Sequence, residues 1–373
     1  MKVQILQENL VKGVIALSKL CVGSGKLPIL SHILFQAKTE GLWLSATDLE
    51  LSVVLKMGAK VEEEGEIAVP ARILGEFLGS LEAGKLILSA ESEQLEIASG
   101  THRAKMQGMG AKEFPEIPTK IKEGLFSFEK DFEDVVGMVA LSAASDESRP
   151  ALTGVLCEAG EKGLQMTATD GYRLSTRLVG MSGKKEKEGK NKKWVVPART
   201  LIEIIGLVKG LKYEEVVNVG ETEDGNQLIF QVGEMVVVSR LLADEFPNVE
   251  QIIPKQGETT IVVGKEELYK AVKMAAIFAR ESANIIRLSV NKSDVVITAN
   301  SPQVGENESK IDAKVTGPMM TIAFNSRYLL DILTAVTAKE VILSVSGALA
   351  PGLFTFEGIK DFLHVIMPVR VQE

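Results

Sequence analysis

The 373-residue chain is poor in cysteine and histidine, the side chains that most often build disulfides and metal sites. Its two cysteines, Cys21 and Cys157, lie far apart and outside any CxxC pattern, which argues against a disulfide framework and a zinc site. The three histidines are scattered along the chain, and no HExxH motif occurs. We therefore expect no metal, no cofactor and a reducing, cytoplasmic environment.

Long hydrophobic runs are also missing. No apolar run approaches the roughly 20 residues that cross a bilayer, and Gln4, Gln7 and Glu8 interrupt the apolar residues near the N-terminus, where a signal peptide is continuous. We expect neither secretion nor a membrane partner. The net charge of −8 argues against a surface that coats nucleic acid indiscriminately, so any DNA contact is expected on one face only.

The sequence does not match the common catalytic motifs. Gly25 and Lys26 resemble the end of a phosphate-binding loop, but Leu20 and Leu27 stand where that motif requires glycine and Ser or Thr. No GxSxG motif is present either. A small-molecule enzyme built on repeated domains remains the rival hypothesis, with Asp48 or Asp170 as its only candidate catalytic carboxylates.

The chain contains an internal repeat. Ala-Thr-Asp occurs at 46–48 and 168–170, Val-Pro-Ala-Arg at 69–72 and 196–199, and Glu-Phe-Pro at 113–115 and 245–247. These anchors keep their order at offsets of 122, 127 and 132 residues (170 − 48, 197 − 70 and 247 − 115). The last third repeats the order more weakly, at 295–306, 323–333 and 364–371. We infer three diverged copies of one unit, with domains at 1–122, 123–255 and 256–373.

Each copy is expected to hold two helices and several antiparallel strands, an α+β fold. Apolar residues at helical spacing predict the first helix of each copy, and acidic residues precede or begin it. A second helix follows each Val-Pro-Ala-Arg anchor, with proline in its first turn. Alternating segments such as 85–90, 94–99, 227–232, 235–240 and 340–345 predict hairpin strands. Residues 118–124 and 254–260 are expected to be linkers, and 183–193 a solvated hairpin loop.

The repeat also bears on Asp48 and Asp170, which occupy equivalent positions. The third copy has Ser301 there, which suits a structural residue better than a catalytic one. Thr and Asp at the end of a strand commonly accept hydrogen bonds from the following backbone in a turn. We interpret both carboxylates as turn residues.

The sequence resembles the bacterial DNA polymerase III beta subunit family, the sliding clamps, over nearly its whole length. The resemblance rests on "LPIL" at 27–30, "ATDLE" at 46–50, "VPAR" at 69–72, "TDGYRL" at 169–174, "EFP" at 245–247, "FNSRYLLD" at 324–331 and "MPVR" at 367–370. It implies a non-catalytic protein. Two copies of the three-domain chain are expected to dimerise head-to-tail and form a six-domain ring. Duplex DNA passes through the ring without base readout. The implied protein partners are the polymerase III catalytic subunit, the clamp loader, and other polymerases and repair proteins.

The resemblance further implies a hydrophobic groove between the second and third domains that receives a short peptide from these partners. Carried over by motif, its residues are Leu152, Thr169, Gly171, Tyr172, Arg173, Leu174 and Pro247 from the second copy, with Asn325, Tyr328, Leu349, Pro351, Val365, Ile366, Met367, Pro368, Val369 and Arg370 from the third. The chain departs from the family at Tyr172, Val369 and Gln251, which puts the peptide preference in question.

Candidate DNA-facing residues are basic residues on or near the expected helices. They are Lys12, Lys26, Arg103, Lys209, Lys273 and Arg280, with Lys26 and Arg103 expected in loops. A sliding ring needs weak phosphate contacts, because tight contacts would slow movement. For each of them, an ordinary solvated surface charge is the alternative.

Overall fold

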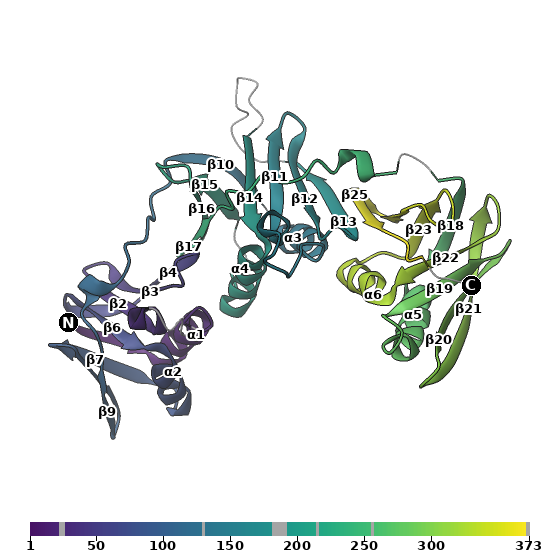
Figure 1. The fold of residues 1–373 in the computed structure, drawn as a ribbon. Coiled ribbons are helices and arrows are strands. Elements are labelled where there is room, and N and C mark those ends of the chain that lie inside the picture. Colours follow the sequence, from purple (N-terminus) through teal and green to yellow (C-terminus); the bar gives the residue numbers. More distant parts are fainter. Residues whose placement is uncertain (22–26, 129–130, 181–191, 214–215, 255–256, 371–373) are drawn as a thin grey trace. The chain divides into compact units, whose positions relative to one another are not determined.

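The computed structural model describes residues 1–21, 27–128, 131–180, 192–213, 216–254 and 257–370. These residues form six α-helices and three antiparallel sheets, as the α+β prediction requires (Figure 1). The helices are α1 (Gln7–Ser18), α2 (Ala71–Ser80), α3 (Phe132–Ala140), α4 (Ala198–Leu211), α5 (Lys265–Ala279) and α6 (Ser326–Ala335). Short 3₁₀ turns occur at Pro28–Ser31, Ala111–Glu113, Pro150–Thr153 and Glu250–Ile252.

The first two sheets have five and eight strands. The order of the five-stranded sheet is β5 (Lys60–Glu63), β1 (Lys2–Leu6), β7 (Lys85–Glu91), β8 (Gln94–Ser99) and β9 (His102–Gln107). The order of the eight-stranded sheet is β10 (Glu123–Phe128), β15 (Val217–Glu221), β16 (Gln227–Val232), β17 (Met235–Arg240), β4 (Leu51–Met57), β3 (Gly41–Thr47), β2 (His32–Lys38) and β6 (Gly65–Pro70).

The third sheet has twelve strands, all from residues 154–366. Its order is β14 (Lys192–Pro197), β11 (Gly154–Gly160), β12 (Gly163–Thr169), β13 (Arg173–Val179), β25 (Ile359–Ile366), β24 (Gly352–Phe356), β23 (Glu340–Val345), β18 (Thr259–Gly264), β21 (Gly305–Thr316), β20 (Asp294–Ser301), β19 (Ile285–Val290) and β22 (Met320–Asn325). The segments predicted as strands at 85–90, 94–99, 227–232, 235–240 and 340–345 all lie in strands, which confirms the alternation argument.

Two strand pairs join distant parts of the sequence. Val53 pairs with Val237 where β4 meets β17, and Leu174 pairs with Val365 where β13 meets β25. Each pair is extended by one further backbone hydrogen bond of the same kind. Arg240 N–H donates to Glu50 O at 2.9 Å, and Met367 N–H donates to Tyr172 O at 2.8 Å. The chain accordingly separates into two compact units, the first mainly Met1–Phe132 with Glu203–Leu241 and the second mainly Leu242–Glu373 with parts of 133–202.

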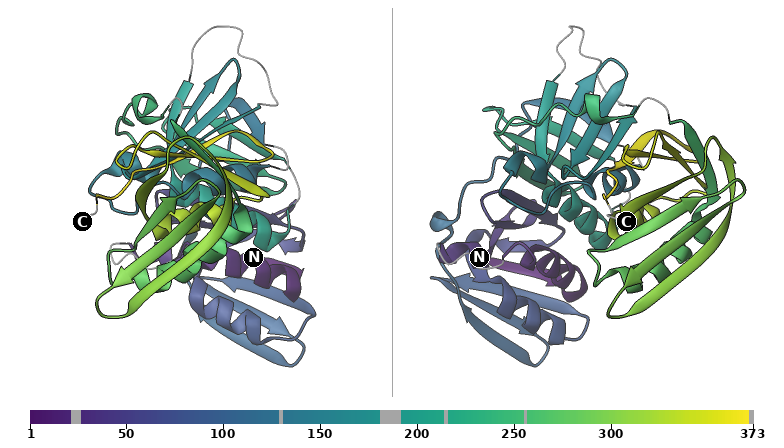
Figure 2. Two further views of the ribbon diagram at one scale, coloured as in Figure 1. Left: turned by 90° about the vertical axis from the view of Figure 1, so that its right-hand side faces the viewer. Right: turned by 45° about the vertical axis from the view of Figure 1, so that its right-hand side comes forward.

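The helices pack through the apolar residues whose helical spacing predicted them. Leu10, Val14 and Leu17 of α1 are fully buried, and α1 packs against α2 in the first unit. In the second unit α5 packs against α6 and covers β19, β20 and β21 (Figures 1 and 2). Acidic side chains lie in the first turns of α1, α3 and α5, where the helix dipole favours them.

One local prediction was wrong. Pro70 is the N-cap of α2, with φ −56° and ψ 115°, so it precedes the first helical turn and closes β6. Of the loop predicted at 183–193, residues 183–191 lie outside the described residues, and Lys192 and Lys193 begin β14.

Candidate functional site

The turn after β12 begins the candidate site. Asp170 Oδ1 accepts hydrogen bonds from Tyr172 N–H at 2.8 Å and Arg173 N–H at 2.9 Å, and Thr169 Oγ1 accepts one from Gly171 N–H at 3.0 Å. The first copy has the same geometry, because Asp48 Oδ1 accepts from the backbone two and three residues on, at 3.0 and 2.7 Å. Both carboxylates therefore organise turns, as the repeat predicted.

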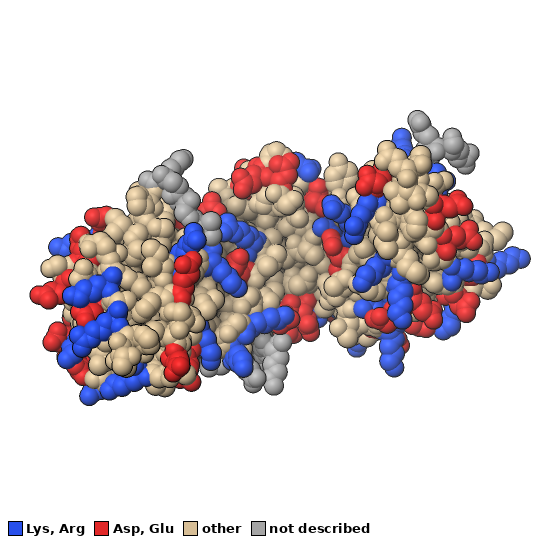
Figure 3. All heavy atoms as spheres, turned by 90° about the horizontal axis from the view of Figure 1, so that it is seen from below, with Lys and Arg blue, Asp and Glu red and all other residues tan. Residues whose placement is uncertain are grey.

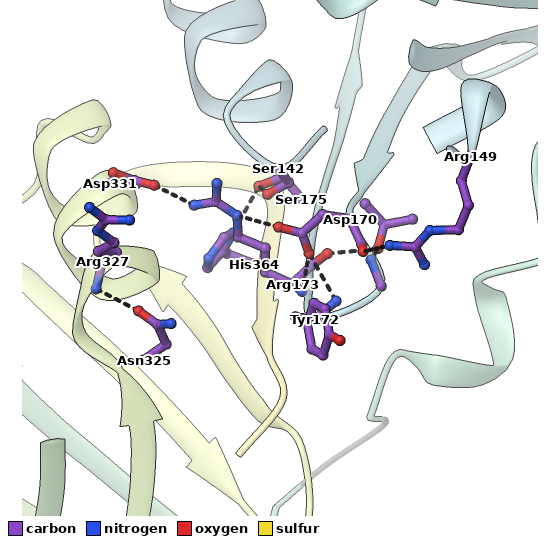
Figure 4. A network of polar contacts seen from close by, with 12 residues as sticks. Ser142, Arg149, Asp170, Tyr172, Arg173, Ser175, Asn325, Arg327, Asp331 and His364 are labelled. Carbon is purple, nitrogen blue, oxygen red and sulfur yellow. Dashed lines mark hydrogen bonds and ion pairs between the residues drawn. The ribbon is translucent and has the colours of Figure 1, made fainter. Parts of the chain in front are cut away.

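The two turns differ in how easily their backbone adopts its conformation. Gly171 has φ 90°, a left-handed value that glycine adopts without steric cost. The equivalent Leu49 has φ 78°, where a branched side chain is strained, and this side chain is 44% exposed. The second copy thus holds the turn with the residue suited to it. Arg149 closes over this turn, with Nη2 donating to Asp170 O at 3.1 Å (Figure 4).

Arg173 is the centre of a polar network that the sequence did not reveal. Its Nε lies 3.1 Å from Asp170 Oδ2 and its Nη1 lies 2.5 Å from Asp331 Oδ2 (Figure 4). Its guanidinium also stacks 4.5 Å from the ring centroid of Tyr328. Arg173 therefore links the turn after β12 to two residues of helix α6. Asp331 lies in the "FNSRYLLD" motif that carried the family resemblance. Its negative charge, opposite to that of Arg173 in the second copy, was the feature of the sequence that could have indicated the ion pair.

The C-terminal residues reach this turn through the β13–β25 ladder. Arg173 pairs with Ile366, and Met367 continues along Tyr172 through the backbone hydrogen bond already described. Val369 N–H then donates to Ala323 O at 2.8 Å. Asn325 caps α6 by accepting from Arg327 N–H at 3.0 Å. The structure thus brings "TDGYRL", "FNSRYLLD" and "MPVR" together, although they are far apart in sequence.

The predicted groove residues differ in exposure. Five of them are buried and cannot present a side chain to a ligand as the structure stands, namely Leu152, Thr169, Leu174, Val365 and Ile366. Three large apolar side chains are exposed: Tyr172 and Leu349, each 61% exposed, and Met367, 37% exposed. Leu174 and Val365 pack with Val249, a residue that the sequence analysis did not name, in a small apolar cluster. Pro247 and Arg370 are exposed, and Pro351, Pro368 and Val369 are half-buried.

A buried polar chain lies beneath this surface. Ser142 Oγ and Ser175 Oγ are 2.8 Å apart, and Ser175 Oγ is 2.8 Å from His364 Nδ1 (Figure 4). Burial, and secondarily the positive charge of Arg173, lower the pKa of His364 to about 3. The imidazole is therefore neutral at neutral pH, and its Nε2 has no hydrogen-bond partner among the described residues.

Comparison with known proteins places the chain in a family. Its three parts match, in order, the N-terminal, central and C-terminal domains of the DNA polymerase III beta subunit, over residues 1–118, 128–248 and 250–370. The chain belongs to the DNA polymerase III beta subunit family. Three tandem domains of this family therefore make up the fold.

Individual beta subunits are similar along their whole length. The beta sliding clamp of Chlamydia muridarum is 28% identical over 352 residues, covering 94% of this chain and 93% of the relative. That of Staphylococcus aureus strain Mu50 is 28% identical over 357 residues, covering 92% of each. The crystal structure of the DNA polymerase sliding clamp from Bacillus subtilis matches with a TM-score of 0.92 and 26% identity, covering 100% of both chains.

The candidate DNA-facing residues of the chain are only partly on helices. Lys12, Lys209 and Lys273 are exposed on α1, α4 and α5, and Arg280 is the exposed C-cap of α5. Arg103 is not in a loop as expected: it lies on β9, 4.0 Å from Glu96. Lys26 lies outside the described residues. On the face drawn in Figure 3, basic and acidic side chains are interspersed.

The remaining titratable groups give little sign of reactive chemistry. Burial raises the pKa of both Cys21 and Cys157 to about 12, so neither thiol is activated. Within the described ranges, no group of three or more His, Cys, Asp or Glu side chains is placed to hold a metal ion. The part of the chain that the structure describes also contains no helix long and apolar enough to span a membrane.

Proposed function

We propose that this protein is a non-catalytic DNA sliding clamp that tethers a replicative polymerase to duplex DNA. The observation that carries the proposal is the match of all three tandem domains to the DNA polymerase III beta subunit, in order and over most of the chain. The turn roles of Asp48 and Asp170 support it, because they leave the rival enzyme hypothesis without its candidate carboxylates.

Topological attachment distinguishes a clamp from an ordinary DNA-binding protein. The protein is loaded by a bacterial clamp loader onto a nicked circular duplex, and the bound fraction is measured by gel filtration before and after linearisation. A clamp is retained on the circle and runs off the linear DNA. Equal retention on both would show contact binding and would contradict the proposal.

The proposed partner site is the surface around Tyr172, Leu349 and Met367. Their exposed apolar side chains suit a short hydrophobic peptide from the polymerase III catalytic subunit, the clamp loader, or other polymerases and repair proteins. The buried Leu174, Val365 and Val249 would support this surface from beneath. Arg173 would hold the turn in place through its pairs with Asp170 and Asp331.

A matched pair of methionines tests this site. Met367→Glu is expected to weaken binding of a fluorescent polymerase-tail peptide by about tenfold or more, since it places an unpaired charge against apolar groups. Met319→Glu alters an equally apolar side chain, 61% exposed, outside the site and should leave the affinity unchanged. Fluorescence anisotropy measures both, and equal loss in the two variants would remove the assignment.

A head-to-tail homodimer is proposed from two strand edges of opposite charge. β9 is the last strand of its sheet and carries Arg103 and Lys105. Residues 305–312 of β21 pair with β20 on one side, whereas β18 pairs only with 313–316, and the open stretch carries the exposed Glu306 and Glu308. Pairing β9 of one copy with this stretch of another would satisfy both edges. Such a heterologous contact closes into a ring when the rotation permits.

Charge exchange tests the dimer. Native mass spectrometry should give twice the chain mass. Reversal of one edge by Arg103→Glu with Lys105→Glu should yield monomers, and mixing this variant with Glu306→Lys/Glu308→Lys should restore dimers through the matched edges. A persistent monomer in the unmodified protein would contradict the ring.

Duplex DNA would be contacted by the exposed basic residues of the helices. Lys12, Lys209, Lys273 and Arg280 remain our candidates, and their spread over three helices suits weak phosphate contacts. Because attachment to the circle is topological, replacing Lys12 and Lys273 with Glu should lower the yield of loading onto circular DNA and flatten the salt dependence of loading. Glu replacement of the exposed Lys60 on β5 is the matched control.

A further inference from the structure

A cavity of about 600 Å³ lies in the first unit, over one face of the eight-stranded sheet. Its floor comes from β2, β3, β4 and β17, and its wall from the extended segment 114–119 after the 3₁₀ turn at Ala111–Glu113. The volume is in the range of small-ligand and peptide sites. This cavity lies in a different compact unit from Tyr172 and Met367.

One end of the cavity is apolar. Val54 of β4 pairs with Val236 of β17, so their side chains stand together on the floor. Phe114 and Ile117 of the wall line the same space; Phe114 belongs to a small apolar cluster with Leu34, and Ile117 packs against that cluster. An apolar side chain placed here would be enclosed from the floor and from the wall.

The other end is cationic over an aromatic floor. Lys38 Nζ and Lys56 Nζ lie 5.1 and 5.6 Å from the ring centroid of the half-buried Trp43. Lys56 is paired with Glu234 at 3.6 Å, whereas no carboxylate lies within ion-pair distance of Lys38 among the described residues. The two ammonium groups beside the Trp43 ring form a candidate binding site for a carboxylate. Lys38 is the side chain that would bind it.

The second unit shows what fills the corresponding space there. Val249 stands 132 residues after Ile117, the offset of the Glu-Phe-Pro anchor. Val249 is buried against Leu174 and Val365 of the paired strands β13 and β25. Ile117 instead packs against the apolar cluster that contains Leu34 and Phe114 and remains half-buried, and the cavity lies over the corresponding strands β4 and β17. The segment around Val249 therefore packs directly on its sheet in the second unit. The equivalent segment around Ile117 in the first unit leaves a cavity between itself and the sheet.

We propose that this cavity is a second peptide-binding site, which accepts an apolar residue with a carboxylate beside it. The apolar side chain occupies the end formed by Val54, Val236 and Ile117, and the carboxylate binds Lys38 above Trp43. The carboxylate belongs either to a peptide C-terminus or to an adjacent Asp or Glu. This site is independent of the proposed groove around Tyr172 and Met367.

Tryptophan fluorescence tests the site directly, because Trp43 is half-buried in it while the other tryptophan, Trp194, is buried elsewhere. Three probes are titrated into the full-length protein: acetyl-Ala-Leu-Phe with a free carboxylate, its C-terminal amide, and acetyl-Asp-Leu-Phe amide. A saturable change is expected with the first probe, the third, or both, and their relative affinities identify the source of the carboxylate. The uncharged amide should bind about tenfold more weakly or worse.

Variants locate the binding. Lys38→Glu should weaken the charged probes by about tenfold or more, while Lys60→Glu, an exposed lysine outside the cavity, should not. Trp43→Phe should remove the fluorescence change, and Met367→Glu should leave it intact. The proposal is overturned if no probe saturates, if the amide binds as well as the acids, or if Met367→Glu abolishes binding while Lys38→Glu does not. Unchanged urea midpoints establish that the variants are folded.

Discussion

Nη1 of Arg173 lies 2.5 Å from Oδ2 of Asp331, and this contact joins the turn after β12 to the exposed face of α6. The two side chains differ in environment, since that of Arg173 is 11% exposed and that of Asp331 is 47% exposed. Water therefore screens the Asp331 side of the pair, while Asp170 and Tyr328 enclose the other side. The position of Arg173 is set mainly by Asp170 and Tyr328.

Asp170→Ala is expected to lower the free energy of unfolding by about 2 kcal/mol, because backbone N–H groups and the Arg173 guanidinium lose their acceptor. Asp48→Ala is the matched control in the equivalent turn, where Leu51 stands in place of Arg173. Urea unfolding followed by circular dichroism should show the smaller loss for Asp48→Ala. Equal losses would mean that the Arg173 contact adds nothing to stability.

His364 predicts a loss of stability in acid. Its pKa is about 3 in the folded protein and 6.5 in an ordinary environment, so between these values the unfolded chain binds the extra proton. Stability conferred by the neutral imidazole is complete above pH 6.5 and is lost as pH falls towards 3, by about 2 kcal/mol at pH 5. Urea unfolding at several pH values should show a shallower slope for His364→Gln than for the unmodified protein. Parallel slopes would assign the acid sensitivity to other groups.

The left-handed turn position predicts opposite effects of two substitutions. Leu49→Gly should raise stability by about 0.5 kcal/mol, because it relieves a φ of 78° at the cost of some chain entropy. Gly171→Ala should lower it by about 1 kcal/mol or more, since φ is 90° and the new Cβ would lie 3.2 Å from Arg149 Nη1. Thermal unfolding of both variants checks the signs, and a destabilised Leu49→Gly would show that the lost leucine contacts outweigh the strain.

Cys157 should react with iodoacetamide only after unfolding. A pKa of about 12 leaves about a thousandfold less thiolate at pH 8 than in an unfolded chain. Mass spectrometry of labelled peptides, with and without denaturing urea, measures the ratio. Rapid labelling of Cys157 in the native protein would contradict its burial.

Much of the fold followed from repetition and periodicity. Three anchors in constant order predicted three similar domains, and alternating segments such as 227–232 and 235–240 became adjacent strands β16 and β17. The boundaries at 122 and 255 stay predictions, because the compact units cut across the middle third of the chain. That division arises from the β4–β17 and β13–β25 pairs, which are long-range contacts that no local pattern reveals.

The candidate site was predicted in part. The motifs around Asp170, Asn325 and Met367 do meet, but the sequence could not separate exposed from buried members of the group. Val365 and Ile366 were predicted to line the groove as apolar residues. They pair with β13, and their side chains are buried in the core. Arg173 was named without its partner Asp331, since an ion pair between two domains depends on their packing.

The β13–β25 ladder has a consequence for synthesis on the ribosome. Ser175 and His364, which meet in it, are 189 residues apart, and β25 is the last strand among the described residues. At the usual pace of translation, β13 waits for roughly ten seconds or more, with one edge unpaired, until its partner emerges. A nascent chain in this state exposes Leu174 and its unpaired backbone, so chaperone capture should persist until β25 has emerged.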